Sequence, residues 1–274
     1  MYDYASELQS TIFTALDQQL TGYRLQKMDL PQASYLATSL DGDPASLIVT
    51  IGDDAAIALR DQSPVIGTTD ICLTGLSDIE PDFDRPVSAI TRIEPDYAEY
   101  LRRLQRTFPD LRTLGVITST KENQRWDSLE RAAEENELKL SRFQITKREE
   151  LSDALNYVAR RADVLFALDD PTIFNQFTAR HILVFCLRQR LPIIGPNAGW
   201  VRSGSIFSVA YDYAELGRSY GELCHQIINA PAHQAPLKLG TPPNAQKYLL
   251  NTKNAELYRM NIELPAAEDV VTYE

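Results

Sequence analysis

Cysteine is scarce in this sequence, and the scarcity excludes several kinds of site. The 274 residues include only Cys72, Cys186 and Cys224. They are too few and too scattered for a disulfide framework, and none has the CxxC spacing of a zinc or redox site. We therefore interpret each one as a small buried apolar side chain rather than a working thiol.

Histidine is equally scarce, and no residue pattern of a catalytic or metal centre stands out. His181 and His225 fall inside predicted helices and His233 in a loop rich in Pro and Ala, so none is placed to act as a base. No His, Cys and carboxylate cluster has metal-ligand spacing. Neither GxGxxG nor GxxxxGK[ST] follows a predicted strand. We expect no catalytic residue, no metal and no cofactor.

Positive charge and long apolar runs are also in short supply. There are 27 Lys and Arg against 38 Asp and Glu, which gives a net charge of −11 and a pI near 4.8. This balance argues against nucleic acid as a partner and against adhesion to anionic membrane. No run approaches the roughly 20 apolar residues of a membrane span, and the start lacks the basic and apolar regions of an export signal.

What is present is an alternation of short β-branched runs and longer amphipathic stretches, which is typical of βα units and a parallel sheet. Residues 69–84, rich in Asp and Pro, are expected to be irregular, and the chain divides into two doubly wound halves near Ile93-Glu94. Strands are predicted at 23–29, 46–51, 64–68, 87–93, 112–118, 139–145, 164–167, 192–195, 206–210 and 246–251, with helices at 2–20, 31–40, 55–60, 96–107, 123–136, 148–161, 173–189 and 213–228.

Polar residues gather where predicted strands end, which is the place where open α/β sheets bind ligands. Asp is also a favoured helix N-cap, and capping is the simpler interpretation of each acid taken singly. Five such turns together favour a ligand site for a zwitterionic or hydroxylated molecule. The candidates are Asp53, Asp54, Thr69 and Asp70 in the first half, and Ser119, Asn123, Asp169, Asp170, Thr172, Asn197 and Trp200 in the second.

Aromatic residues lie near these turns in the sequence and could line the ligand site. They are Trp126, Phe174, Trp200 and Tyr211. The alternative for each is packing in the core. Trp200, in an Asn-Ala-Gly-Trp segment expected to be a loop, is the least core-like.

Four segments carry a resemblance to a known family. SLIVTIGDDAAIAL resembles its strand, Gly-Thr-Pro-Ala-Ala turn and helix, with Asp53-Asp54 where Thr-Pro is usual. RTFPDLRTLGVITS resembles the opening of its second domain, and NTKNAELYRMNIELP its closing element. LPIIGPNAGWVRSGSIFSVAYDYAELGRSYGELCHQII resembles its most recognisable block. From Ser46 to Pro265 the chain is thus similar to the periplasmic substrate-binding proteins of ABC transporters, in the family with aromatic amino-acid-binding members.

The resemblance implies a type 1 periplasmic-binding-protein fold, with two lobes joined by a three-strand hinge. Lobe 1 would hold residues 1–93 plus 212–241, and lobe 2 residues 94–211 plus 242–274. A monomeric, periplasmic protein would capture an amino-acid-like ligand by hinge closure and deliver it to an ABC permease. Tyr211 and Asp212 join the ligand candidates, and Asp212→Ala and Trp200→Ala are expected to weaken binding with little effect on folding.

The chain also departs from the family, because such lobes begin with a central strand before the first helix. Here the chain opens directly in the predicted helix at Tyr2, so the first strand of lobe 1 is expected to be missing. We hypothesise a truncated form whose strand and export signal would lie upstream of Met1.

Two alternatives to a transport protein stay open. One is a periplasmic sensor or accessory protein that uses the same two lobes to signal to a protein partner. The other is an enzyme that uses Asp169 with Asp170, or Asp53 with Asp54, as acid and base. The lack of a nearby His, Cys or metal cluster weighs against the enzyme.

Overall fold

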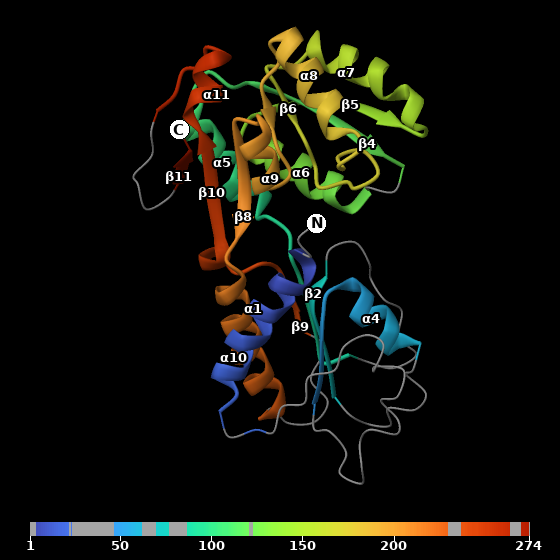
Figure 1. The fold of residues 1–274 in the computed structure, drawn as a ribbon, viewed down its shortest axis with the longest axis vertical. Helices are drawn as coiled ribbons and strands as arrows, with labels where there is room; N and C mark the ends of the chain where they lie inside the picture. The colour runs from blue at the N-terminus through green and yellow to red at the C-terminus, as the bar shows by residue number, and fades with distance from the viewer. Residues whose placement is uncertain are drawn as a thin grey trace. The chain divides into compact units, whose positions relative to one another are not determined.

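A computed structural model of the chain describes residues 4–21, 23, 47–61, 70–76, 87–120, 123–229, 237–263 and 270–273 (Figure 1). These residues form two compact units. Unit 1 takes those within Met1–Pro95 and Tyr211–Ala245, and unit 2 those within Asp96–Ala210 and Gln246–Glu274. Each unit is therefore built from two separate stretches of chain.

Unit 1 is a parallel sheet with helices packed against it. The described strands follow the order β1-β2-β3-β9, and each of these neighbouring pairs is parallel. Runs such as Leu-Ile-Val-Thr-Ile suit a buried strand because β-branched side chains pack well on a pleated surface. The elements are α1 (Tyr4–Gln19), β1 (Leu47–Ile51), α4 (Asp53–Arg60), β2 (Asp70–Leu76), β3 (Ala89–Arg92), α10 (Tyr213–Ile228) and β9 (Leu237–Leu239).

Helices α1 and α10 lie side by side although about 200 residues separate them in the sequence (Figure 1). Ile12 and Leu16, one turn apart on α1, share a buried cluster with Leu216 and Tyr220 of α10. Gly217 lets the two backbones approach closely, because a Cβ there would lie 2.5 Å from the Ile12 carbonyl oxygen. Unit 1 therefore depends on both of its stretches of chain.

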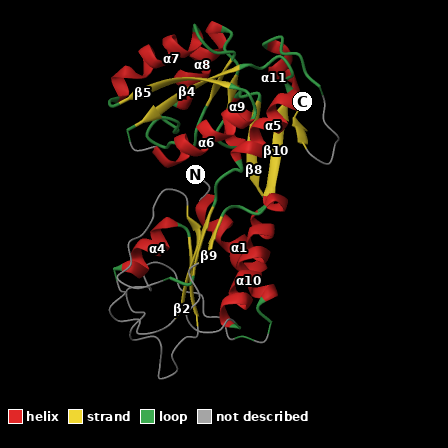
Figure 2. Cartoon of the chain, turned by 180° about the vertical axis from the view of Figure 1, so that it is seen from behind, coloured by secondary structure: helices red, strands yellow, loops and turns green. Residues whose placement is uncertain are grey.

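Unit 2 has a larger sheet with helices on both faces (Figure 2). Its described strands follow the order β11-β10-β8-β7-β6-β4-β5. The strands are β4 (Thr113–Ser119), β5 (Lys139–Ile145), β6 (Val164–Phe166), β7 (Ile193–Ile194), β8 (Phe207–Tyr211), β10 (Gln246–Asn251) and β11 (Val270–Tyr273). The helices are α5 (Tyr97–Thr107), α6 (Asn123–Glu135), α7 (Leu151–Ala159), α8 (Ala179–Gln189), α9 (Ala198–Ser203) and α11 (Thr252–Leu257).

An aromatic layer joins α5 to this sheet. The Tyr100 ring lies 5.4 Å from the ring of Phe166, 6.0 Å from that of Phe207 and 5.7 Å from that of Tyr248. Each of these strand residues is buried, and burial raises the pKa of the Tyr100 phenol well above its usual range. Large, tightly packed rings of this kind give unit 2 a rigid core.

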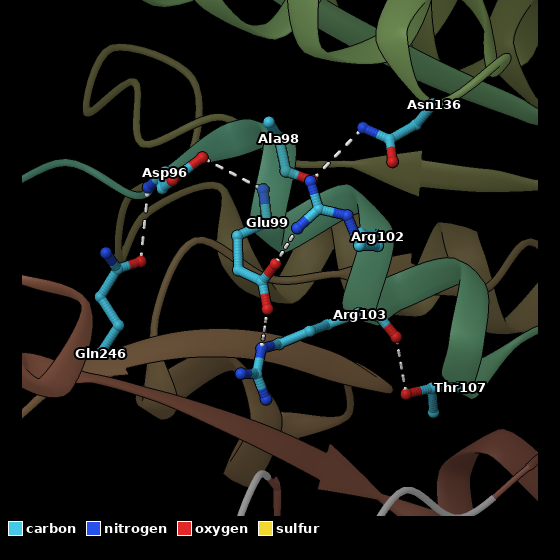
Figure 3. Close-up of polar contacts among 8 residues, drawn as sticks. All are labelled: Asp96, Ala98, Glu99, Arg102, Arg103, Thr107, Asn136 and Gln246. Atoms are coloured by element: carbon cyan, nitrogen blue, oxygen red, sulfur yellow. Dashed lines mark hydrogen bonds and ion pairs between the residues drawn. The ribbon is translucent and has the colours of Figure 1, made fainter.

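Polar contacts fix the first turn of α5 (Figure 3). The Asp96 carboxylate accepts a hydrogen bond from the Glu99 amide at 3.1 Å, so Asp96 is the N-cap. The Asp96 amide donates to Oε1 of Gln246 at 3.4 Å, and Arg103 Nε donates to Glu99 at 2.6 Å. The start of α5 is thus tied to the start of β10.

A matching contact occurs in unit 1, just before the chain leaves it. The Glu94 amide donates to the Thr241 hydroxyl at 2.9 Å, and that hydroxyl donates to the Arg92 carbonyl at 3.0 Å. The Asp212 amide donates to the Ala245 carbonyl at 2.8 Å. The segments that pass between the units are therefore hydrogen-bonded to one another near each passage.

The predicted alternation of parallel strands and helices is confirmed, but in unit 1 strand β9 was not predicted and the prediction for β2 is wrong. Residues 70–76 were expected to be irregular, yet they form strand β2, which is buried from Ile71 to Leu76. The Asp and Pro content of residues 69–84 suggested an irregular stretch, but Ile71-Cys72-Leu73 packs between two neighbouring strands. Of the strand predicted at 23–29 only Tyr23 is described, as a bend, and the predicted strand at 64–68 and helix at 31–40 lie outside the described residues.

Two further differences lie in unit 2. The helix predicted to begin at Ile173 begins at Ala179, because residues 170–178 form successive turns held by the Asn175 and Thr178 side chains. The segment expected to be a loop around Trp200 is the short helix α9. No helix among the described residues combines the length and apolar character needed to cross a membrane.

Candidate functional site

The carboxyl edge of the unit 2 sheet brings several predicted residues together. Asp170, which follows β6, is only 1% exposed. Its Oδ2 accepts the Ser119 amide at 3.1 Å, and its Oδ1 accepts the Thr172 amide at 2.9 Å as well as the Thr172 hydroxyl. The buried carboxylate thus joins the end of β4 to the turn after β6.

Asp169 differs from its neighbour because its side chain is exposed. Its carbonyl oxygen accepts a hydrogen bond from Nη1 of Arg125, a residue in the first turn of α6 that is 7% exposed. Arg125 therefore brings a positive charge to the same edge. The sequence analysis missed it, since an Arg in the first turn of an amphipathic helix usually faces solvent; its place directly after the β4 turn was the available signal.

Trp126, next to Arg125, is buried rather than open to a ligand. It is 7% exposed, and the Arg142 guanidinium lies 4.2 Å from the centre of its ring. Arg142 Nε also donates to the Thr118 hydroxyl at 2.9 Å. The cation–π contact covers one face of the indole, which supports the core-packing interpretation.

Trp200 is also a core residue, and the expectation that it lies in a loop is wrong. It is 7% exposed, belongs to the main apolar cluster of unit 2, and meets Phe174 edge-on at 5.9 Å. Removing such a side chain costs roughly 3–5 kcal/mol, so Trp200→Ala would not leave folding unaffected. Asn197 is exposed and is the N-cap of α9, where it accepts the Gly199 amide at 3.0 Å.

In unit 1, Asp53 and Asp54 follow the end of β1 as predicted, but neither is the N-cap of α4. The N-cap is Gly52, whose φ of 89° suits glycine. Asp53 and Asp54 occupy the first turn, where carboxylates interact favourably with the positive end of the helix dipole. Asp54 is exposed.

Asp70 does not belong to this edge, and its predicted place at a carboxyl end is wrong. It begins β2 and pairs with Leu47, whereas Thr74 pairs with Ile51 at the end of β1. Parallel strands run in the same direction, so Asp70 lies at the amino edge of the sheet, opposite Asp53. Thr69 lies outside the described residues, and Asn123 begins α6.

Tyr211 and Asp212 close the list of predicted residues. Tyr211 ends β8 and packs against the apolar cluster of α1 and α10. Asp212 is the N-cap of α10, where it accepts the amides of Ala214 and Glu215, both at 3.1 Å. Removing such a cap costs about 1 kcal/mol, so Asp212→Ala is expected to lower stability by about that much, and its effect on ligand binding stays a prediction.

The sequence analysis missed three buried threonines at the carboxyl edge of the unit 1 sheet. Thr50, Thr74 and Thr91 lie near the ends of β1, β2 and β3 and are 5%, 0% and 3% exposed. Thr74 Oγ1 donates to the Thr50 carbonyl at 2.5 Å, and Thr91 Oγ1 accepts the Gly75 amide at 3.0 Å. Their position close to each strand end was the signal that could have found them.

The described residues hold no group of three or more His, Cys, Asp or Glu side chains suited to a metal ion. What the edges offer instead are carboxylates, hydroxyls, backbone amides and the Arg125 guanidinium. These groups form hydrogen bonds and ion pairs with small polar molecules. The chemistry available is recognition of a ligand with charged or hydroxyl groups.

Comparison with known proteins agrees with this chemistry. A "Tyrosine-binding protein" of Clostridioides difficile (strain R20291) is 25% identical over 210 residues, which is 73% of this chain and 59% of that protein. The chain therefore spans somewhat under two thirds of that relative's length.

Solved structures share the fold. A ligand-free, open substrate-binding protein with adhesive properties from Clostridium difficile has a TM-score of 0.69 at 18% identity, covering 98% of this chain and 94% of that one. An "ABC domain" in complex with L-Trp from Streptococcus pneumonia has a TM-score of 0.62 at 17% identity, covering 97% and 95%. The fold is thus the two-lobe, type 1 periplasmic-binding-protein fold that the sequence predicted.

The family assignment rests on nearly the whole chain. Residues 7–263 match the family described as ABC transporter substrate binding protein. The two units, the parallel sheets and the polar carboxyl edges all accord with that match. The chain belongs to the ABC transporter substrate binding protein family.

Proposed function

We propose that this protein binds a small amino-acid-like ligand and delivers it to an ABC permease. The observation that carries the proposal is the carboxyl edge of the unit 2 sheet, where the exposed Asp169 and Thr172 side chains lie beside the buried Arg125 and Asp170. This edge is the position at which open α/β sheets bind ligands.

Both charges of a zwitterion find a partner at this edge. The Asp169 carboxylate would accept hydrogen bonds from the ligand's ammonium group, and the Thr172 hydroxyl could add a further bond. The positive charge of Arg125 favours a carboxylate nearby. The buried Asp170 holds Ser119 and Thr172 in place, so the edge is preformed before a ligand arrives.

The relatives support the amino-acid class. One is named for binding tyrosine, and a structural neighbour was solved with L-Trp. A permease partner, a periplasmic location and a monomeric state are the finer parts of the proposal, and the family supports the first two. Asp53, Asp54 and Asn197 remain candidates for further ligand contacts.

A ligand screen tests the proposal. Thermal unfolding would be followed with each amino acid, and with nucleosides and sugars as other classes. A ligand that binds only the folded state raises the unfolding midpoint by mass action, so an amino acid should produce the largest shift. Titration calorimetry would then give the affinity.

Two aspartates make a matched pair of variants for that titration. Asp169→Asn removes the charge at the proposed site and should weaken binding at least tenfold. Asp110→Asn removes the charge of another exposed aspartate, located before the amino end of β4, and should leave affinity unchanged. The proposal fails if no amino acid shifts the midpoint, and the site assignment fails if both variants bind like the parent.

Delivery to a permease needs its own measurement. The protein and a candidate ABC permease would be reconstituted in lipid vesicles, and ATP hydrolysis followed. Ligand-loaded protein should stimulate hydrolysis more than ligand-free protein does. Equal rates with both forms, at saturating ligand, would contradict delivery while leaving ligand binding intact.

A further inference from the structure

Three exposed apolar side chains lie along the outer side of α8. The inner side of this helix is ordinary core, because Ile182 and Cys186 are buried in the main apolar cluster of unit 2 with residues of α7, beside which α8 lies (Figure 1). On the outer side, Phe177, Val184 and Leu187 are 72%, 40% and 51% exposed. In α6 and α7, no described large apolar side chain is exposed. Packing within unit 2 therefore does not account for these three.

Helical spacing makes the three side chains part of one surface. Residues three and four positions apart are neighbours on a helix, and those around Val184 are all exposed: Arg180, His181, Leu187 and Arg188. Phe177 extends this surface by one turn, because the Ala179 amide donates to the Asn175 carbonyl at 2.9 Å in the α-helical pattern. We call Phe177, Arg180, His181, Val184, Leu187 and Arg188 the α8 stripe. It is roughly 15 Å long.

The stripe carries positive charge that this chain leaves unpaired. Among the described residues, neither Arg180 nor Arg188 forms an ion pair. Residues 171–211 contain four Arg and no Asp or Glu, although the whole chain has 38 acids. The α8 stripe is therefore a positive and partly apolar surface on an acidic protein.

We propose that the α8 stripe is a docking surface for a protein partner whose own surface is an apolar groove bordered by carboxylates. A single helix that projects apolar side chains one and two turns apart fits such a groove. Aromatic residues and Arg are enriched at protein interfaces, and a guanidinium binds a carboxylate through two parallel hydrogen bonds. The Arg side chains of the stripe would pair with the acids at the border of the groove.

Charge favours this partner over two others. A second copy that docked through the same stripe would bring Arg180 and Arg188 of both protomers together, and like charges at close range are unfavourable. An anionic bilayer faces a whole side of the molecule, and the net charge of −11 opposes that approach. A small acidic groove meets only the local positive charge, because charges more than about 8 Å away are screened.

Selection from a random peptide library tests the chemistry of the partner. The full chain without added amino acid would select peptides, and so would the variants Leu187→Ser and Leu257→Ser. Leu257, on α11, is 63% exposed and lies outside the stripe, so its variant is the matched control. Peptides enriched on the parent and on Leu257→Ser, but not on Leu187→Ser, should combine Asp or Glu with large apolar residues.

Charge reversal tests the role of the arginines with one enriched peptide, by fluorescence anisotropy. Arg180→Glu and Arg188→Glu should each weaken binding of the peptide at least tenfold. Arg106→Glu, at an exposed position of α5, is the matched control and should change the affinity less than twofold. Added salt should weaken binding to the parent, because it screens exposed ion pairs. Exposed positions tolerate substitution, so every variant should keep the parent's thermal midpoint.

Four results would overturn the proposal. Two are a selection with no peptide that depends on Leu187, and enriched peptides that lack acids. Binding of the parent, but not of Leu187→Ser, to phosphatidylglycerol vesicles would assign the stripe to a membrane. A dimer in sedimentation velocity that Leu187→Ser loses would assign it to a second copy. Titration of Leu187→Ser with an amino acid should match that of the parent, so the result is separate from that of the proposed function.

Discussion

Asp169 and Asp170 are adjacent acids with different tasks. Asp170 points inward, where its carboxylate accepts backbone amides from Ser119 and Thr172, while Asp169 is exposed. Charge-assisted bonds of this kind are stronger than neutral ones, and a buried donor left without its acceptor is costly. Asp170 is therefore a structural residue that positions the ligand-facing groups around it.

Substitution of Asp170 should lower the free energy of unfolding. Asp170→Ala removes the buried carboxylate that accepts hydrogen bonds from the Ser119 and Thr172 amides, so we expect the free energy of unfolding to fall by about 3 kcal/mol in urea titrations. Thr172→Ala, at an exposed position, should cost less than about 1 kcal/mol. Equal losses in the two variants would contradict the structural role of Asp170.

Among individual residues, the sequence identified only part of the candidate site in unit 2. Ser119, Asp169, Asp170 and Thr172 were predictable because each lies at or after the end of a strand with a clear apolar run. Arg125 was not, because its role depends on which carbonyl lies across the turn, and that is a tertiary contact. Whether these residues touch a ligand stays a prediction.

At the scale of elements, close packing of α1 on α10 organises unit 1. Gly217 and Gly221 face α1, and a Cβ at Gly221 would lie 2.5 Å from the Gln19 Cβ. Small residues one turn apart allow the helix backbones to approach. The two glycines therefore lower the helix propensity of α10, but they allow α10 and α1 to pack closely.

Gly217→Ala should destabilise unit 1 despite the better helix propensity of alanine. The new Cβ would lie 2.5 Å from the Ile12 carbonyl and 2.7 Å from the Ala15 Cβ, so α1 must shift. We expect a net loss of about 2 kcal/mol in the free energy of unfolding by urea. Ser219→Ala on the same helix should change it by less than about 0.5 kcal/mol, and equal values for both would refute the packing argument.

Elements with a clear hydrophobic period were predictable, and the exceptions have physical causes. Helix α10 and strand β4 followed directly from their patterns. Strand β2 did not, because its central apolar run is flanked by Asp, Thr and Gly, which usually mark turns. Helix α9 is only six residues long, and Asn and Gly at its start are typical of loops.

At the scale of the whole molecule, the chain passes between the units after Pro95, after Ala210 and after Ala245. A movement of one unit against the other must therefore bend these passages together. The bonds from Glu94 to Thr241 and from Asp96 to Gln246 couple two of them. Family resemblance predicted this connectivity, whereas composition alone gave only a length suited to one or two domains.

Hinge closure around a ligand remains a prediction, and X-ray scattering can test it. At saturating ligand, the radius of gyration should be smaller than in the ligand-free protein, because only the closed state would make every ligand contact. An unchanged scattering curve, with calorimetry showing saturation, would contradict closure.

The split composition of unit 1 also has a consequence for its synthesis. The apolar face of α1, with Ile12 and Leu16, is covered by Leu216 and Tyr220 of α10. At roughly 5–20 residues per second, a ribosome needs at least about 10 seconds to make the chain between them. Throughout that time α1 has no native partner from α10, so the nascent protein offers a chaperone an apolar helix face long before unit 1 can fold.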